Sequence, residues 1–270
     1  MKTVAIVGVG LIGGSFALAL RASGFTGRII GVSSPDAVRV AIERGVIDEA
    51  LPIADAAAVA DLIYLARPIE GILSVVDELD SYVKPGTLIT DAGSTKSAIC
   101  ARAAEKIQRG RFVGGHPMAG KEARGAAEAE ATLFRGRPYI LTSRCGELEQ
   151  LIAGFGARMT IISAEEHDTL VALTSHLPQL ISTALAASIG TEPDAARVAG
   201  PAAMDMTRLA LSPYEIWRDI FATNAPNIDA ALGVFIAKIE ELRTQLRGPQ
   251  IEREFENAAA AARALRESRK

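Results

Sequence analysis

The sequence predicts an α/β protein with a doubly wound parallel sheet in its first half and an all-helical second half. Two observations lead to this class. Short β-branched runs alternate with helical stretches up to residue 162, with a glycine-rich turn between the first run and the first helix. After residue 162 the apolar periodicity is helical. We therefore expect two domains, residues 1–162 and 163–270.

Composition indicates a folded protein without a strong charge bias. Of 270 residues, 49% are hydrophobic, and 29 Lys+Arg stand against 32 Asp+Glu. This balance predicts no attraction to nucleic acid or to an anionic membrane, and no apolar run approaches the ~20 residues that cross a bilayer. Cys100 and Cys145 form neither a metal-type spacing nor a disulfide framework, so we expect a cytoplasmic protein without a metal site.

The glycine-rich turn predicts a dinucleotide site of the Rossmann type. Gly8-Val9-Gly10-Leu11-Ile12-Gly13 follows the strand expected at 4–7 and opens the helix expected at 15–20. Gly8 permits the tight turn, Gly10 lets the backbone approach a pyrophosphate, and Gly13 lets the helix pack on the strand. Leu11 and Ile12 complete the loop, and the helix N-terminus offers N–H groups to phosphate.

The end of the second strand, 28–32, bears on the choice between NAD and NADP. Ser33 stands where a strict NAD fingerprint has an acidic residue, which leaves room for a 2′-phosphate. Ser34 is the expected N-cap of the next helix, and Arg39 lies a turn further on, within reach of a phosphate. Both cofactors stay open, with NAD slightly preferred.

The first half continues with strands and helices in alternation. We expect strands at 61–66, 87–90, from 112, 138–142 and 158–162, and helices at 69–82, 98–108 and 147–155. The run from Val113 to Pro117 predicts a buried strand that ends in a fixed turn, with His116 at its carboxyl end. Ligands bind at that end of a parallel sheet. Ser94 follows another strand end, either as an active-site group or as a helix N-cap.

The second half predicts helices with one interruption. Pro178 should kink the helix at 164–189, near which Ser175 and Gln179 share a face with His176 beside them. Further helices are expected at 205–211, 214–224, 227–246 and 252–270. An apolar stripe runs from Ile228 to Leu246. It suits a core helix or a subunit interface equally well, and with the second use we expect a homodimer through this half.

Five short segments together resemble the prephenate/arogenate dehydrogenase family of tyrosine biosynthesis. They occur in the family's order, and the block at His116 with the one at His176 is the most specific part. The segments are Gly8–Ser15, Asp91–Lys96, Gly115–Gly120, Ser175–Pro178 and Trp217–Ile220.

This resemblance implies an enzyme that oxidatively decarboxylates prephenate with hydride transfer to NAD(P). His116 matches the family's catalytic histidine, which accepts the hydroxyl proton of the substrate. Ser94 matches a serine between that hydroxyl and the nicotinamide. The family also implies a helical dimerisation domain.

Six further residues match substrate-binding positions of the family: Arg208, Ser175, His176, Gln179, Lys96 and Glu122. Four of them have a plain structural alternative. Arg208 suits a ring carboxylate or a surface ion pair with Asp205. His176 suits the substrate side chain or a packing seam, and Lys96 and Glu122 suit the pocket or solvent. His167, outside the matched segments, is interpreted as structural or exposed.

Other readings of the chain stay open. Many relatives that use prephenate have a histidine where Gln179 stands, so arogenate or dual specificity is a close alternative. Other two-domain dehydrogenases, such as β-hydroxyacid dehydrogenases or imine reductases, share the fold and the glycine loop. A non-enzymatic dinucleotide sensor is the remaining alternative, and it would leave His116 and Arg208 without a role.

Overall fold

The computed structural model describes residues 1–121 and 123–267, which form two compact units, 1–225 and 226–270. The first unit contains both sheets and the helices up to the start of α10. The second unit contains the rest of α10 and α11. The expected domain division between residues 162 and 163 follows the change from mixed to helical structure and stays a prediction.

A six-stranded parallel sheet in the order β3-β2-β1-β4-β5-β6 organises the first unit, as the sequence predicts. The change in strand order between β1 and β4 is the switch point at which such sheets bind ligands. The strands are β1 (Thr3–Val7), β2 (Arg28–Val32), β3 (Glu49–Ala50), β4 (Leu62–Leu65), β5 (Leu88–Asp91) and β6 (Arg111–Val113).

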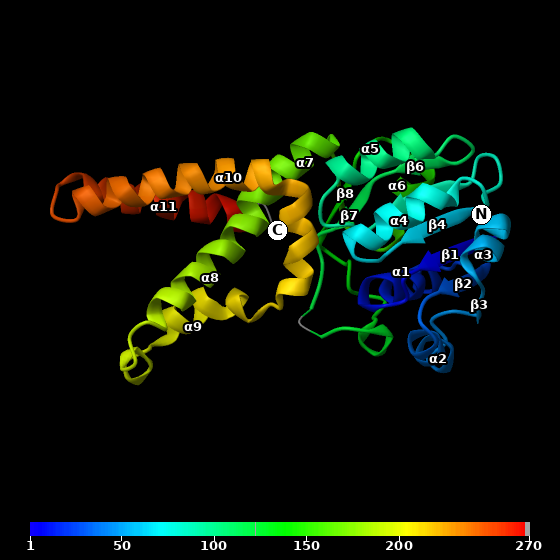
Figure 1. Ribbon diagram of the computed structural model, residues 1–270, viewed down its shortest axis with the longest axis horizontal. Coiled ribbons are helices and arrows are strands. Elements are labelled where there is room, and N and C mark those ends of the chain that lie inside the picture. The colour runs from blue at the N-terminus through cyan, green and yellow to red at the C-terminus, as the bar shows by residue number, and fades with distance from the viewer. Residues whose placement is uncertain (122, 268–270) are drawn as a thin grey trace. The chain divides into compact units, whose positions relative to one another are not determined.

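Five helices connect these strands (Figure 1). Helices and strands together enclose an apolar core. β1 and β4 are almost entirely buried, as their unbroken apolar runs predict. Phe16 of α1 stacks on Tyr64 of β4 with ring centroids 3.8 Å apart. The helices are α1 (Leu11–Ala22), α2 (Pro35–Glu43), α3 (Ile53–Val59), α4 (Ile69–Leu79) and α5 (Ser97–Lys106).

The next strands build a separate three-stranded sheet, so the prediction that they extend the parallel sheet is wrong. β7 (Gly115–Pro117) pairs antiparallel with β8 (Pro138–Leu141), which pairs parallel with β9 (Arg158–Ile161). Between β8 and β9 lies α6 (Gly146–Gly154). The chain leaves the first sheet after β6 and enters the second at once, at Gly114.

The helical part of the first unit contains one π-helical turn. α7 (Ala164–Val171) leads into the π turn Ala172–His176, and α8 (Leu177–Ile189) follows with Pro178 in its first turn. A π turn inserts a residue and so releases the backbone bond that proline cannot make. The predicted interruption at Pro178 is therefore confirmed, and it lies at Ser175 and His176.

The remaining helices of this unit are α9 (Pro201–Thr207), which runs into a 3₁₀ turn at Arg208–Leu211, and the first part of α10 (Tyr214–Gln245). α8 and α9 lie side by side and extend away from the sheets (Figure 1). α10 is kinked at Asn224, where the backbone is not helical, and Pro226 follows.

The second unit consists of the later part of α10 and α11 (Gln250–Glu267), which lie side by side (Figure 1). Lys238 of α10 bonds Glu254 of α11 at 3.2 Å. Several large apolar side chains of this unit are exposed, among them Val234, Ile236 and Phe255.

Two segments, 164–189 and 214–245, are long and apolar enough on average to cross a membrane. Each is interrupted, the first by the π turn and the second by the kink at Asn224. Each also contains buried polar side chains, including Asp168 in the first and Asp219 in the second.

Candidate active site

The glycine loop has the shape that a dinucleotide needs. Gly8 has φ +98, and a Cβ there would overlap the carbonyl oxygen of Ala66. A Cβ at Gly13 would overlap the carbonyl oxygen of Gly8, whereas the space above Gly10 is open to 4 Å. α1 then begins without a side-chain cap or an acidic residue in its first turn, so its N–H groups stay available to a pyrophosphate. The residues present therefore fit the cofactor.

The other expected cofactor residues flank this loop. Leu11 and Ile12 form the first turn of α1 and pack against the apolar core. Ser33 and Ser34 are exposed at the end of β2, and Ser34 occupies the N-cap position of α2, as expected. Arg39 pairs with Glu43 at 3.0 Å.

His116 lies in the middle of β7, not at the carboxyl end of a strand of the parallel sheet as the sequence predicts. Its place depends on Gly115, where a Cβ would stand 2.6 Å from the backbone oxygen of Asp91. This close approach lets Gly115 donate its N–H to the Asp91 carboxylate at 3.0 Å. β7 is thereby joined to the carboxyl end of β5, which leads directly to Ser94.

Lys96 does not face a ligand, so its predicted role in substrate binding is wrong for this structure. Its side chain is fully buried. The ammonium group forms an ion pair with Asp91 and donates to the carbonyl oxygen of Gly115 at 2.8 Å. Lys96 thus neutralises Asp91 and fixes the backbone next to His116.

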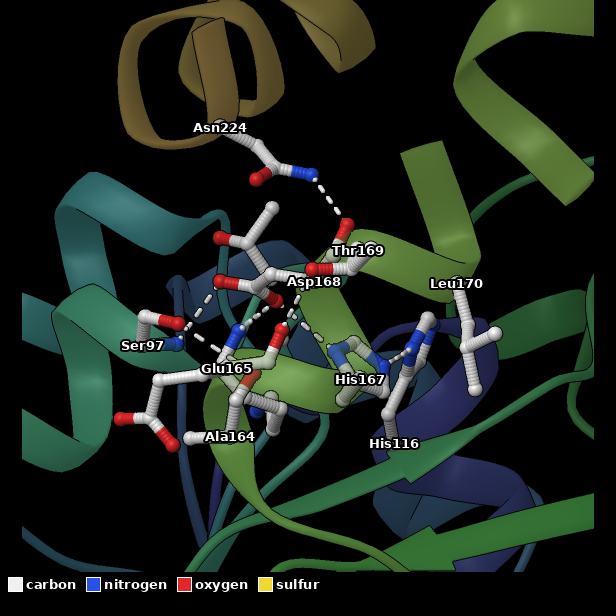
Figure 2. A network of polar contacts seen from close by, with 12 residues as sticks. Ser97, His116, Ala164, Glu165, His167, Asp168, Thr169, Leu170 and Asn224 are labelled. Carbon is white, nitrogen blue, oxygen red and sulfur yellow. Dashed lines mark hydrogen bonds and ion pairs between the residues drawn. The ribbon is translucent and has the colours of Figure 1, made fainter. Parts of the chain in front are cut away.

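His116 forms a hydrogen-bonded pair with a second imidazole (Figure 2). Nδ1 of His116 lies 2.9 Å from Nε2 of His167, and Nδ1 of His167 lies 2.8 Å from a carboxylate oxygen of Asp168. His167 is completely buried, so the interpretation of this residue as exposed is wrong. Its sequence position beside Asp168 was the one available signal.

Asp168 is held in place by the start of α5. Its two oxygens accept the backbone N–H groups of Lys96 at 2.7 Å and Ser97 at 2.9 Å (Figure 2). Burial raises the pKa of Asp168, but the hydrogen bonds from His167 and from these two N–H groups outweigh it and leave the pKa below its usual value. The carboxylate is therefore ionised and accepts only.

Burial lowers the pKa of His116 well below its usual value, and the nearby His167, Lys96 and His176 lower it further. The imidazole is accordingly neutral at neutral pH. A neutral imidazole has one nitrogen with a free electron pair, which is what a general base requires.

His176 is attached to the same network through Asn224. The Asn224 amide donates to the backbone oxygen of Asp168 at 2.8 Å, and its nitrogen lies 3.2 Å from Nδ1 of His176. Burial lowers the pKa of His176 to about 4. The side chain of Asn224, at the kink of α10, thus contacts His176 in the π turn. Ser175 lies in that turn, partly buried, and its role stays a prediction.

A cavity of about 240 Å³ lies at the carboxyl ends of β4 and β5. Ser94 lines it, so Ser94 is a cavity residue, while the N-cap position of α5 belongs to Lys96. Asp219 of α10 also lines it and accepts the backbone N–H of Glu70 at 3.1 Å, at the start of α4. This is the edge of the sheet where the reactive end of a dinucleotide would lie.

A second cavity, of about 270 Å³, shares Arg124 and Ile216 with the first. Three cationic side chains line it, Lys121, Arg124 and Arg208, and none of the described lining residues is acidic. Such a cavity suits a ligand with carboxylate groups. Glu122, also expected here, lies outside the described residues.

Gln179 lines this cavity and also bonds the backbone of Leu209, another lining residue. Its amide nitrogen donates to the carbonyl oxygen of Leu209 at 2.9 Å and lies 3.3 Å from the hydroxyl of Thr183. That hydroxyl donates to the backbone oxygen of Gln179, so it accepts from the amide. Both amide hydrogens are thus used, and the polar atom left for a ligand is the acceptor Oε1.

The fold and the site together define a nucleotide-binding protein of the Rossmann type, with a hydrogen-bonded imidazole pair and a basic cavity lined by Lys121, Arg124 and Arg208. Two family models match the chain, "Prephenate dehydrogenase, nucleotide-binding domain" over residues 16–153 and "Prephenate dehydrogenase, dimerization domain" over residues 163–259. The chain belongs to the prephenate dehydrogenase family.

Individual relatives agree with this assignment. The chain is 35% identical to a prephenate dehydrogenase of Bacillus subtilis, over 94% of this chain and 72% of the relative. It is 34% identical to one of Lactococcus lactis, over 83% of this chain, but spans 65% of that relative's length. A crystal structure of prephenate dehydrogenase from A. aeolicus in complex with hydroxyphenyl propionate and NAD+ is 29% identical, with a TM-score of 0.91 over 98% of both chains.

Proposed function

We propose that this protein oxidatively decarboxylates prephenate with a nicotinamide dinucleotide as hydride acceptor. The observation that supports this most is the neutral His116, which is bonded through Nδ1 to His167 and follows Gly115, whose N–H bonds Asp91 at the strand end that leads to Ser94. A base in that position serves an alcohol oxidation at the nicotinamide end of the cofactor site.

In the proposed reaction His116 takes the proton of the ring hydroxyl. A hydride leaves the carbon that bears this hydroxyl, and CO₂ leaves the opposite ring carbon. The electrons of the broken bond between that ring carbon and the carboxylate carbon complete the aromatic ring of 4-hydroxyphenylpyruvate. Formation of the aromatic ring drives the step. The bound nicotinamide supplies the hydride acceptor. Ser94, which lines the first cavity, orients the hydroxyl in this proposal.

Two features of the protein supply the remaining requirements. The low pKa of His116 keeps it neutral and ready to accept a proton at neutral pH. The cations of the second cavity, above all the planar guanidinium of Arg208, bind the carboxylates of the substrate and hold the ring in register.

One observation favours a second candidate substrate, arogenate. Prephenate and arogenate differ only in the side chain, which has a keto group in the first and an ammonium group in the second. The acceptor Oε1 of Gln179 would bond an ammonium group but not a keto oxygen. The absence of an acidic residue among the described lining residues of this cavity supports prephenate as the first choice.

NAD is the proposed cofactor, with NADP as the alternative. The end of β2 has Ser33 where an acidic residue would reject a 2′-phosphate, but the nearest cation of α2, Arg39, is already paired with Glu43. Ser33 therefore does not repel the 2′-phosphate of NADP, and Arg39 is not available to bind it without leaving Glu43.

We also propose a cytoplasmic homodimer that forms through the helical half. The exposed apolar side chains of α10 and α11 support an interface there. Cys100 and Cys145 are both free thiols, which agrees with a reducing compartment.

A direct assay tests the proposal. Purified protein is mixed with prephenate or arogenate and with NAD or NADP, and the absorbance of the reduced cofactor is followed. We expect turnover with prephenate and NAD. A preference for arogenate would replace the substrate and leave the chemistry intact, whereas no turnover in all four mixtures would contradict the proposed function.

A further inference from the structure

We propose that His167 is a positioning residue that fixes the tautomer of His116, so that Nε2 of His116 is the atom that accepts the proton. This inference rests on the proposed function for its catalytic meaning. It uses a buried histidine that the family resemblance left without a role. The hydrogen bonds run from Asp168 to His167 and then to His116.

The first step is the direction of the bond between Asp168 and His167. The carboxylate of Asp168 is ionised and has no hydrogen to give. Its oxygens are fixed by the backbone N–H groups of Lys96 and Ser97, so it cannot rotate away. Nδ1 of His167, 2.8 Å from it, must therefore hold a hydrogen and donate it.

The second step is the direction of the bond between the two imidazoles. A His167 ring whose only hydrogen is the one on Nδ1 has a free electron pair on Nε2, so Nε2 accepts. The group 2.9 Å away, Nδ1 of His116, then donates. A neutral His116 with its hydrogen on Nδ1 has its free pair on Nε2. The opposite tautomer of His116, with its hydrogen on Nε2, would place an electron pair of each ring between the two nitrogens, and no hydrogen bond would form.

The charged surroundings agree with this direction. On the side of α5, Lys96 is neutralised by Asp91 of β5. In the π turn, His176 is neutral, since burial lowers its pKa to about 4. On α7, Asp168 contributes a negative charge that two successive hydrogen bonds, through His167, connect to His116. When His116 takes the substrate proton, this carboxylate stabilises the resulting imidazolium through His167.

Isotope-edited NMR tests the tautomer without any need for turnover. The chain has three histidines, so ¹⁵N-labelled histidine gives six ring-nitrogen signals that variants His116→Asn and His176→Gln assign. At neutral pH we expect Nδ1 of His116 to be protonated and Nε2 to be unprotonated. A spectrum with the hydrogen on Nε2 of His116 would overturn the inference, whatever the enzyme's substrate.

Kinetics of two His167 variants test its role in the reaction. His167→Leu removes the acceptor with little change of volume, and we expect kcat to fall by about 10²- to 10⁴-fold, the upper value being the loss when a catalytic histidine is left in the wrong tautomer. KM for prephenate should change by no more than about 2-fold, because the basic cavity is untouched. His167→Gln keeps an acceptor and should recover at least about 10-fold of that loss.

The outcomes separate the two proposals. If the wild-type protein turns over prephenate but both His167 variants keep full kcat, the inference is wrong and the function stands. If His167→Leu and His167→Gln lose activity equally, with a folded thermal profile, a purely structural role replaces ours. If the wild-type protein has no activity, the function is wrong, and the NMR measurement alone decides the tautomer.

Discussion

Nδ1 of His116 lies 2.9 Å from Nε2 of His167, although 51 positions separate the two residues in the chain. The first histidine belongs to a strand of the second sheet and the second to α7. The candidate base is thus oriented by the helical part of the unit. A change that shifts α7 against β7 is therefore expected to impair chemistry even if cofactor and substrate still bind.

The basic cavity makes a prediction about substrate affinity. Arg208→Gln should raise KM for prephenate about 10- to 100-fold, the loss expected for a charged hydrogen bond to a carboxylate, with kcat within about 3-fold of wild type. Steady-state kinetics measure both constants. Arg197→Gln, at an exposed arginine paired with Asp194, is the matched control and should leave KM unchanged. An unaltered KM in Arg208→Gln would refute the assignment.

The buried pair of Lys96 and Asp91 makes a prediction about stability. Lys96→Met should lower the free energy of unfolding by about 3–5 kcal/mol, because it leaves the Asp91 charge buried without its partner. Urea unfolding measures this loss. Lys84→Met removes a half-exposed lysine from its pair with Asp61 and should cost at most about 1 kcal/mol. Equal effects of the two substitutions would show that Lys96 is not structural.

Stability should also depend on pH through His176. Its pKa is about 4 in the folded protein against the usual 6.5, so the unfolded chain takes up a proton at a higher pH than the folded chain. This contribution is complete above pH 6.5 and is lost as the pH falls to 4, by about 3 kcal/mol at most. In His176→Gln the decline over this range should be smaller by that amount. An identical decline in both proteins would contradict the low pKa.

The end of β2 predicts how cofactor choice can be altered. Ser33→Asp should lower kcat/KM for NADP at least about 10-fold relative to NAD, because a carboxylate there repels the 2′-phosphate and bonds the ribose hydroxyls. Kinetics with each cofactor at saturating prephenate give the ratio. Ser81→Asp, on an exposed serine after α4, is the control. A ratio that Ser33→Asp leaves unchanged would mean that the ribose does not lie at Ser33.

Much of the fold could be predicted because the signals are local. A β-branched run followed by GxGxxG defines β1 and α1, and the predicted span of β2 coincides with the strand in the structure. Pro178 similarly predicts the interruption at the π turn. The second sheet could not be separated from the first in this way, since a strand's own residues do not say whether its neighbour is parallel or antiparallel. The direction of pairing depends on contacts with residues that are distant in the sequence.

The site was predictable to the extent that a short segment defines it. Ser94, Gln179 and Arg208 all line cavities, while their roles in binding and catalysis stay predictions. The partners of His116 were missed because they are contributed by a distant helix. Lys96 stands in a polar segment that suggests solvent, yet its ammonium group is enclosed by Asp91 and the backbone of Gly115. Burial of a charge becomes visible only when its counterion is placed.

The most direct test of the central claim compares the wild-type protein with His116→Asn in the formation of reduced cofactor from prephenate and NAD. A general base accounts for about 10²- to 10⁴-fold in rate, so we predict that kcat falls by that factor while KM for prephenate stays within about 3-fold. Thermal unfolding verifies that the variant is folded. A folded His116→Asn variant with wild-type kcat would show that His116 is not the base.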